Sequence, residues 1–309
     1  MVPDSSHHAG SLRGGGPFGA SPRNLRSGQP GYKTWLERTV RLALAKSLAV
    51  SAFVSVNSII GPPSEDLHMT PHKELEVDIW RGAEDGRFQR FQVPYRDNQT
   101  VLDVVTWVQR HREPGLAYRF ACRVGMCGSC AMAVNGRPRW TCRTHVSKVS
   151  RDGALTIAPL RNLPKIKDLV TDMTGFFEKW QKAGGRHRGT ASRHDPPARV
   201  PPDSAPRRAA DAGVECINCA VCYAACDVVS WMPEYLGPAA LNRTWTLLND
   251  ERYDERQALL TAVSVAGGCH SCHTHGSCAE HCPVGINPTL AIAGLKRATL
   301  TGHLPGGGP

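Results

Sequence analysis

Twelve cysteines in three tight groups limit what this chain of 309 residues can fold into. Four cysteines lie within each of the ranges 122–142, 216–226 and 269–282. Disulfide frameworks belong mainly to small secreted domains, whereas short C-x-x-C spacing on a longer chain favours metal ligands. Metal ligation needs free thiolates, so we expect the cysteine-bearing part to work in a cytoplasm or an equivalent matrix.

The net charge of +10 lies mostly outside the cysteine groups. Residues 1–70 hold seven Lys/Arg against four Asp/Glu, and residues 181–212 hold seven against three. The composition of both segments is typical of disorder. We therefore expect no nucleic-acid partner, because the basic charge lies in solvated segments and not on a folded face.

Composition divides the chain into five segments. Residues 1–70 are expected to be a disordered leader similar to a transit peptide, or an extension wrongly included before a start at Met69. Within it, Leu42–Ile60 is too polar for a convincing membrane span. We then predict a first domain over 71–181, a linker over 182–212, a helical domain over 213–300 and a disordered tail over 301–309.

The first domain begins with strand patterns. Leu75, Val77 and Ile79 alternate with polar residues, Asp85-Gly86 predicts a hairpin turn, and a second strand should end at Pro94. A helix is expected next, from valines at 101, 104, 105 and 108, with Thr100 and Asp103 as its capping pair. This order is typical of a β-grasp, ubiquitin-like ferredoxin domain.

The second domain shows helical spacing after its cysteines. The apolar positions are Leu241, Trp245, Leu247 and Leu248, followed by Leu259, Leu260 and Val263. The predicted fold class is therefore α+β: an N-terminal β-grasp domain like plant-type ferredoxins, followed by an all-α domain like bacterial ferredoxins.

The first cysteine group has the spacing C-x4-C-x2-C, and eleven residues separate its third cysteine from the fourth. This is the plant-type ferredoxin pattern, and it predicts a 2Fe-2S cluster. Gly125 and Gly128 allow backbone N–H groups to approach the cluster sulfurs. A zinc site is the alternative, but zinc prefers paired short knuckles. The predicted ligands are Cys122, Cys127, Cys130 and Cys142.

The second and third groups form a crossed bacterial-ferredoxin pattern. Cys216 to Cys226 follow C-x2-C-x2-C-x3-C, and in two-cluster ferredoxins the fourth cysteine of each run ligates the other cluster. This rule assigns Cys216, Cys219, Cys222 and Cys282 to a 4Fe-4S cluster. It leaves three thiolates for the last site, which predicts a 3Fe-4S cluster on Cys226, Cys272 and Cys278.

From about Glu74 to Arg297, outside the linker, the chain resembles the iron–sulfur subunit of succinate dehydrogenase and fumarate reductase. The resemblance is carried by residues 118–130, 135–139, 216–226, 237–240 and 272–288. It implies an electron relay between the FAD of a flavoprotein subunit and a quinone at a membrane anchor of one or more subunits that can bear haem. The direction, succinate oxidation or quinol-dependent fumarate reduction, stays open.

The resemblance also implies sites and a location. Trp231 and His273 align with residues of the family's quinone pocket, and the dicarboxylate chemistry belongs to the partner chain, so we expect no catalytic residue here. The expected location is peripheral, on the cytoplasmic face of the plasma membrane or, alternatively, on the matrix side of the mitochondrial inner membrane. Packing beside the last cluster is the alternative role for Trp231 and His273.

Three residues depart from the patterns. Asp227 follows Cys226 where bacterial runs have proline, so it either lowers the potential of the last cluster or is a surface residue at a helix end. His275 stands at the missing fourth corner and is either a bystander or an extra iron ligand. Cys269 has no assigned partner and is expected to be a buried spare thiol.

Three rival functions remain open at this point. A subunit of a different complex, of thiol-linked fumarate reductase or glycolate oxidase type, would not explain the plant-type loop. A free ferredoxin carrier would not explain the quinone-pocket residues. A structural zinc protein would be colourless, whereas an iron–sulfur protein is brown.

Overall fold

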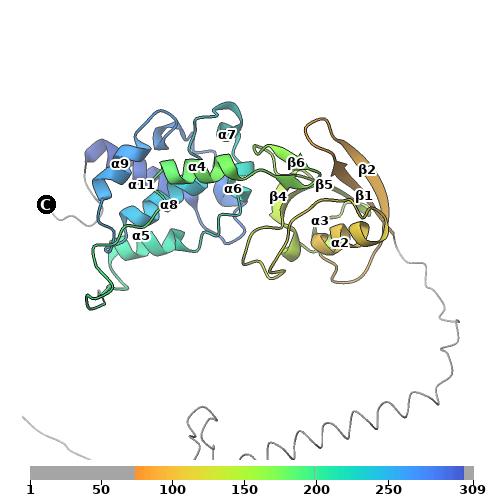
Figure 1. The fold of residues 1–309 in the computed structure, drawn as a ribbon, viewed down its shortest axis with the longest axis horizontal. Coiled ribbons are helices and arrows are strands. Elements are labelled where there is room, and N and C mark those ends of the chain that lie inside the picture. The colour runs from red at the N-terminus through yellow and green to blue at the C-terminus, as the bar shows by residue number, and fades with distance from the viewer. Residues whose placement is uncertain (1–73, 198, 303–309) are drawn as a thin grey trace, which may run out of the picture. The chain divides into compact units, whose positions relative to one another are not determined.

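The computed structural model describes residues 74–197 and 199–302. The predicted leader, residues 1–70, and residues 303–309 of the predicted tail lie outside the described residues. Figure 1 shows that the described strands gather in one part of this chain and the helices from α4 onward in another.

A mixed sheet of five strands forms the first part. Its strands are β1 (Glu74–Arg81), β2 (Arg87–Pro94), β3 (Ala131–Val134), β4 (Arg137–Trp140) and β5 (Ala154–Ala158), in the order β2-β1-β5-β3-β4. β1 pairs parallel with β5, and all the other pairs are antiparallel. The predicted hairpin is confirmed, although residues 82–86 form a longer turn than the Asp85-Gly86 dipeptide suggested.

Helix α2 (Val101–His111) covers the sheet and begins with the predicted capping box. The Thr100 hydroxyl accepts the Asp103 N–H at 3.2 Å, and the Asp103 carboxylate accepts the Thr100 N–H at 3.0 Å. This pair satisfies two N–H groups that a helix start leaves without partners. The valines of α2 pack against alternate residues of the strands, namely Leu75, Val77, Ile79, Phe91, Val93, Met132, Val134, Leu155 and Ile157.

Short elements lie between β4 and β5 and between β5 and α4. They are the 3-10 helix η2 (Thr141–Arg143), α3 (Val146–Val149), β6 (Lys165–Lys167) and β7 (Val170–Thr171). Between β6 and β7 the buried Asp168 carboxylate accepts the N–H groups of Gly82 and Ala117, each at 2.8 Å. It therefore fixes the hairpin turn to the segment that leads into the first cysteine loop.

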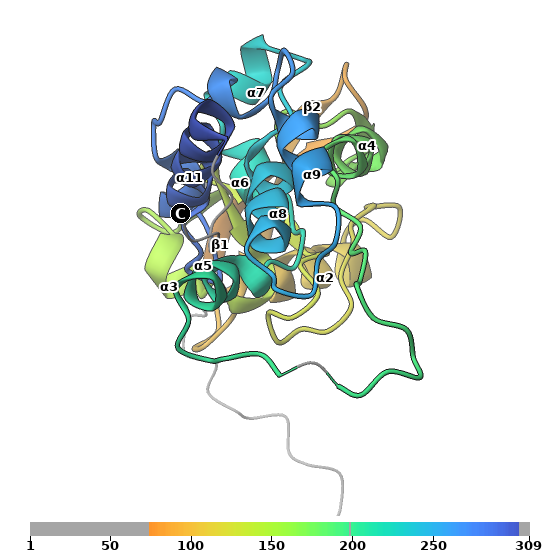
Figure 2. The ribbon, with the colours of Figure 1, turned by 90° about the vertical axis from the view of Figure 1, so that its left-hand side faces the viewer.

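The second part is built from helices, as its apolar spacing predicted. They are α4 (Thr174–Lys182), α5 (Ala205–Val214), α6 (Val221–Ala224), α7 (Asp227–Trp231), α8 (Pro238–Leu248), α9 (Arg256–Val263), the 3-10 helix η3 (Cys269–Ser271), α10 (Ser277–Glu280) and α11 (Pro288–Thr301). Helix α8 contacts α4, α5, α9 and α11, and Figure 2 shows it among α5, α9 and α11. Leu241, Leu247 and Leu248 on α8 are buried, so α8 is the centre of this core.

The structure differs from the prediction at the end of the linker, because α5 begins at Ala205 inside the segment 182–212. Ser204 caps it by accepting the Arg207 N–H at 3.1 Å. The Arg207 side chain is buried and lies 2.8 Å from Asp211, with Asp250 and Glu251 also close. These tertiary ion pairs stabilise a helix that composition alone assigned to disorder.

Among residues 74–197 and 199–302, the longest apolar stretches fall short of what a membrane-crossing helix requires.

Candidate metal centres

All twelve cysteines are free thiols in the structure. The first set is Cys122, Cys127, Cys130 and Cys142, with three members on the loop before β3 and the fourth on η2. The N–H groups of Met126 and Cys127 donate to the Cys122 sulfur at 3.2 and 3.3 Å. Gly125 and Gly128 both have positive φ, of +76° and +71°, so the loop uses the freedom that glycine provides.

The thiols of the first set lie in two electrostatic environments. The pKa of Cys127 is lowered to about 6 by the backbone N–H of Cys122 and by Ser129. In contrast, burial raises the pKa of Cys142 to about 11, and its neighbour Cys130 adds to the effect. Cys130 and Cys142 face the interior, whereas Cys127 is exposed. The loop thus closes over a buried side and leaves one edge open to solvent.

The second set is Cys216, Cys219, Cys222 and Cys282, gathered from the loop after α5, from α6 and from the segment after α10. Burial raises the pKa of Cys222 well above its ordinary value, and charges on Cys219, Cys216, Cys278 and Cys282 act in the same direction. Burial also raises the pKa of Cys216, and the charge of Cys282, which lies 66 residues later, acts in the same direction. The charge of Cys278, which was assigned to the third set, acts on Cys222 as well, so the division of these cysteines between two clusters stays a prediction.

The third set is Cys226, Cys272 and Cys278, at the start of α7, after η3 and in α10. Burial raises the pKa of Cys278, and the charges of Cys226 and Cys272 act in the same direction. A cavity opens at these three cysteines and is also lined by Tyr235 and His275. Tyr235 is fully buried, and burial together with the nearby Cys272 raises the pKa of its hydroxyl.

The two residues predicted for a quinone pocket lie beside the third set. The rings of Trp231 and His273 meet edge to face with centroids 5.7 Å apart, and Trp231 is 59% exposed. His275 stacks on His273 at 6.0 Å and also contacts Trp231. The structure thus joins Trp231, His273 and His275 in one exposed aromatic group at the edge of the cavity.

Asp227 and Cys269 have separate surroundings. Asp227 accepts a hydrogen bond from Arg161 at 2.6 Å, so a cation lies close to the carboxylate that was expected to influence the last cluster. Cys269 is fully buried, near Thr299 and Lys296, and burial raises the pKa of its thiol. Its sulfur lies 3.9 Å from the Thr299 hydroxyl, and the assignment of Cys269 as a spare core thiol stays a prediction.

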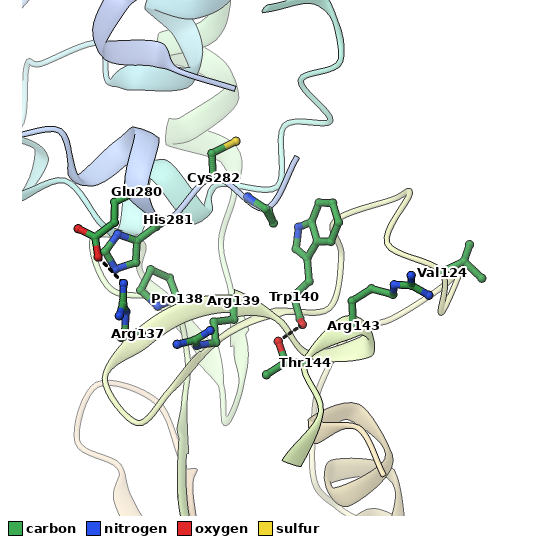
Figure 3. Close-up of a pocket in the computed structure, with 11 residues that line it drawn as sticks. Val124, Arg137, Pro138, Arg139, Trp140, Arg143, Thr144, Glu280, His281 and Cys282 are labelled. Atoms are coloured by element: carbon green, nitrogen blue, oxygen red, sulfur yellow. Dashed lines mark hydrogen bonds and ion pairs between the residues drawn. The ribbon is translucent and has the colours of Figure 1, made fainter. Parts of the chain in front are cut away.

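The first and second sets meet at a close backbone contact. A Cβ atom on Gly128 would lie 2.5 Å from the Cys219 Cβ, far closer than van der Waals contact allows. Trp140, at the end of β4, also approaches this contact: it lies against Gly125 and lines a cavity with Cys282. Figure 3 shows Trp140 rising from β4 toward the loop that carries Cys282, and the Arg137–Glu280 ion pair beside it.

Two consecutive residues after β5 hold the backbone between the second and third sets. The Arg161 guanidinium donates to the Ala224 carbonyl at 2.7 Å. The Asn162 amide donates to the carbonyls of Tyr223 and Cys226 at 3.0 and 2.9 Å. These bonds satisfy carbonyl groups at the end of α6, which a helix terminus otherwise leaves without partners.

Sequence reasoning missed Gly128 as a contact to another set, and it missed Trp140, Tyr235, Arg161 and Asn162. Trp140 carried one usable signal, because a large aromatic residue stands two positions before Cys142. Arg161 and Asn162 carried none, since their roles depend on carbonyl groups about 60 residues away. In the described part of the chain, no three His, Cys, Asp or Glu side chains converge closely enough to hold a single metal ion.

Two family models match the two parts of the chain. Residues 75–178 match a 2Fe-2S iron–sulfur cluster binding domain, and residues 214–286 match a 4Fe-4S dicluster domain. Together with the mixed sheet and the helical part, these matches define an iron–sulfur protein with a 2Fe-2S domain followed by a 4Fe-4S domain.

Known relatives give the family. The chain is 36% identical to the mitochondrial succinate dehydrogenase [ubiquinone] iron-sulfur subunit 1 of Oryza sativa, over 65% of this chain and 71% of the relative. It is 34% identical to the fumarate reductase iron-sulfur subunit of Mycobacterium tuberculosis, over 69% of this chain and 86% of that relative. The chain belongs to the family of iron–sulfur subunits of succinate dehydrogenase and fumarate reductase.

A solved structure has the same fold. A chain of the Mycobacterium smegmatis Sdh1 complex in the apo form superposes with a TM-score of 0.67 at 28% identity, covering 74% of this chain and 97% of that chain. The predicted resemblance and the 2Fe-2S and 4Fe-4S domains are therefore confirmed, and the rivals that lie outside this family lose their support.

Proposed function

We propose that this chain is the electron-transfer subunit of a succinate:quinone oxidoreductase, and that it connects the FAD of a flavoprotein partner with quinone at a membrane anchor. The same relay run in reverse, as in a quinol:fumarate reductase, uses the same residues. Membership of the family supports the complex, and the order of the cysteine sets supports the relay.

The residues fit three clusters. Cys122, Cys127, Cys130 and Cys142 would hold the 2Fe-2S cluster, Cys216, Cys219, Cys222 and Cys282 the 4Fe-4S cluster, and Cys226, Cys272 and Cys278 the 3Fe-4S cluster. Free thiols, N–H donors aimed at the Cys122 sulfur and a cavity at the third set support this fit. When bound, such clusters supply transfer of single electrons. The fold names that go with these sets are a plant-type β-grasp domain and a bacterial-ferredoxin-like domain.

The observation that carries the proposal is the serial placement of the sets. The first touches the second where Gly128 lies on Cys219. The second and third sets then share short elements. Cys222 lies in α6 and Cys226 follows that helix, while Cys278 lies in α10 and Cys282 follows it. A chain of neighbouring sites is what stepwise electron transfer across a protein requires.

The two ends of this series suit different partners. At the first set, Phe120, Val124 and Met126 expose apolar surface around the cysteine loop, which suits docking of the flavoprotein. At the third set, the exposed Trp231 offers an indole N–H to a quinone oxygen, and His273 stands beside it. We place the chain peripherally at a membrane, through its anchor partner, and on the cytoplasmic face in a bacterial cell.

The proposal is tested by purifying the chain from its own cells with a small affinity tag. We expect a larger FAD-containing protein and a membrane protein to co-purify, and the complex to reduce a soluble quinone when succinate is added. Recovery of a brown chain without a flavoprotein, and without any reaction toward succinate or fumarate, would contradict the proposal and favour a free ferredoxin carrier.

A further inference from the structure

Arg161 joins the sheet part of the chain to the backbone that carries the start of the third cysteine set. It follows β5, and its Nε donates to the Ala224 carbonyl at 2.7 Å. Its Nη2 donates to the Asp227 carboxylate at 2.6 Å and lies 3.5 Å from the Ala225 carbonyl. The planar fork of arginine allows one side chain to hold carbonyls and a carboxylate at once. Arg161 therefore bonds to both neighbours of Cys226 in the chain.

Asp227 brings a negative charge to the third cysteine set. It lines the cavity formed with Cys226, Cys272 and Cys278, and among the described residues around this cavity it carries the one carboxylate. A carboxylate beside an iron–sulfur cluster disfavours reduction, because the reduced cluster carries more negative charge for the carboxylate to repel. Acting alone, Asp227 would therefore lower the reduction potential of a cluster at this site.

The Arg161 guanidinium brings the opposite charge to the same place. Its ion pair with Asp227 leaves the two side chains neutral together, so their effects on the third set oppose each other. Each effect is modest, because the two side chains are 57% and 55% exposed, and water and salt screen charges at a surface. A screened charge of this kind should change a reduction equilibrium by about threefold.

We propose that Arg161 is a positioning residue that holds the segment around Cys226 and offsets the charge of Asp227, so that the reduction potential of the last cluster does not fall. The pair joins side chains 66 positions apart, so a cation from the sheet part adjusts a site in the helical part. This inference rests on the proposed function, because it takes the cysteines of the third set to be ligands of the last cluster.

The test is a pair of charge-removing substitutions in the intact complex, with the potential of the last cluster measured by redox titration and EPR. Arg161→Gln leaves the Asp227 carboxylate without its cation and should lower the reduction equilibrium about threefold, which is about 28 mV for one electron. Asp227→Asn leaves the cation without its carboxylate and should raise the equilibrium by a similar factor. The double variant has the net charge of the wild type and should return to the wild-type potential.

The double variant and two further variants separate the charge of Arg161 from its structural role. If Arg161 acted only by holding the backbone, Asp227→Asn would not restore the potential lost in Arg161→Gln. Arg161→Lys keeps the charge and loses the fork, so its potential should stay near the wild-type value while its thermal unfolding midpoint falls. Arg188→Gln is the matched control and should leave the potential unchanged, because Arg188 forms a similarly exposed ion pair with Glu255, at 2.7 Å, outside this cavity.

Two results would overturn the inference and leave the proposed function intact. One is an unchanged potential in Asp227→Asn with full iron content, which decides the matter even if Arg161→Gln does not fold. The other is a double variant that keeps the lowered potential of Arg161→Gln. In contrast, a wild-type complex without any cluster on the third set would overturn both the inference and the three-cluster relay.

Discussion

Gly128 and Cys219 touch, although 91 positions separate them in the chain, and a single added methyl group at Gly128 would lie 2.5 Å from the Cys219 Cβ. Glycine at this position also adopts a φ of +71°, which side chains disfavour. The close contact sets the distance between the loop of the first cysteine set and Cys219, a proposed ligand of the next cluster.

Gly128→Ala should therefore destabilise the protein by more than the backbone strain at this position alone would. An alanine at positive φ costs about 1–2 kcal/mol, and here the two loops must also separate. We expect a lower thermal unfolding midpoint and a weaker magnetic coupling between the reduced 2Fe-2S cluster and its neighbour in EPR spectra. Gly136→Ala is the control, because Gly136 has a similar φ of +77° with nothing within 4 Å of an added Cβ. Equal effects from both variants would show that the contact does not matter.

Asn162 should be needed for the environment of the last cluster. Asn162→Gly keeps the positive φ of 66° and loses the two bonds to the carbonyls of Tyr223 and Cys226. We expect a loss of about 1–3 kcal/mol of stability and a broadened 3Fe-4S EPR signal. Asn135→Gly removes an amide that bonds to Val149 and Thr156, away from the cysteine sets. It should lose similar stability with sharp EPR signals, and broadening in both variants would contradict the assigned role.

Cysteine substitutions should separate ligands from the spare thiol. Cys278→Ser is expected to remove the 3Fe-4S signal and to leave the 2Fe-2S signal, because serine replaces a thiolate of the third set only. Cys269→Ser should keep every signal, since Cys269 lies buried near Thr299 outside all three sets. Iron content and EPR spectra of both variants check this, and a lost 3Fe-4S signal in Cys269→Ser would move that residue into the ligand set.

Trp231→Phe should slow quinone reduction without changing the clusters. The variant keeps the exposed aromatic ring and loses the N–H donor, and one hydrogen bond is worth about 0.5–1.5 kcal/mol. We expect a fall of roughly twofold to tenfold in succinate-dependent quinone reduction, with unchanged reduction of a soluble dye that accepts electrons from the flavoprotein. Trp107→Phe, on α2 where Trp107 stacks on His111, should have no effect. Normal quinone kinetics in Trp231→Phe would remove Trp231 from the pocket.

Acid should weaken the helical part through Asp250. Hydrogen bonds from Arg252 hold the pKa of the buried Asp250 carboxyl well below its ordinary value of 3.8, and Arg207 acts in the same direction. A lowered folded-state pKa contributes stability that is present above the unfolded pKa and is lost as pH falls through the folded one. Asp250→Asn should therefore lose about 2–3 kcal/mol near neutral pH.

The difference in the free energy of unfolding between wild type and Asp250→Asn should stay constant down to about pH 5. It should become smaller below the ordinary carboxyl pKa near 4. Denaturant unfolding at several pH values, with iron content measured at each, checks this pH dependence. A stability difference between the two proteins that becomes larger as the pH falls would contradict the assigned ion pair of Asp250 with Arg252.

Local signals explain what could be predicted. The alternation at Leu75, Val77 and Ile79 and the capping pair Thr100–Asp103 act within a few residues, so the strands and α2 follow from sequence. The cysteine spacing predicted the 2Fe-2S and 4Fe-4S domains that the family models match, because ligands of one cluster must obey a loop geometry that leaves a regular pattern.

Long-range packing explains what could not be predicted. The parallel pairing of β1 with β5 joins residues about 80 positions apart, and no short motif encodes it. Helix α5 forms because Arg207 meets two consecutive acidic residues, Asp250 and Glu251, of a segment distant in the sequence. Trp140 and Asn162 likewise gain their roles only from neighbours that the fold brings to them.

Stepwise reduction of the anaerobically purified complex, followed by EPR, tests the three-cluster relay most directly. The account predicts a 3Fe-4S signal in the oxidised protein, then 2Fe-2S and 4Fe-4S signals on reduction, with His275 as a bystander beside Trp231. Three clusters' worth of iron without an oxidised 3Fe-4S signal would instead make His275 a fourth ligand of the last cluster. Absence of all three signals in intact brown protein would contradict the relay itself.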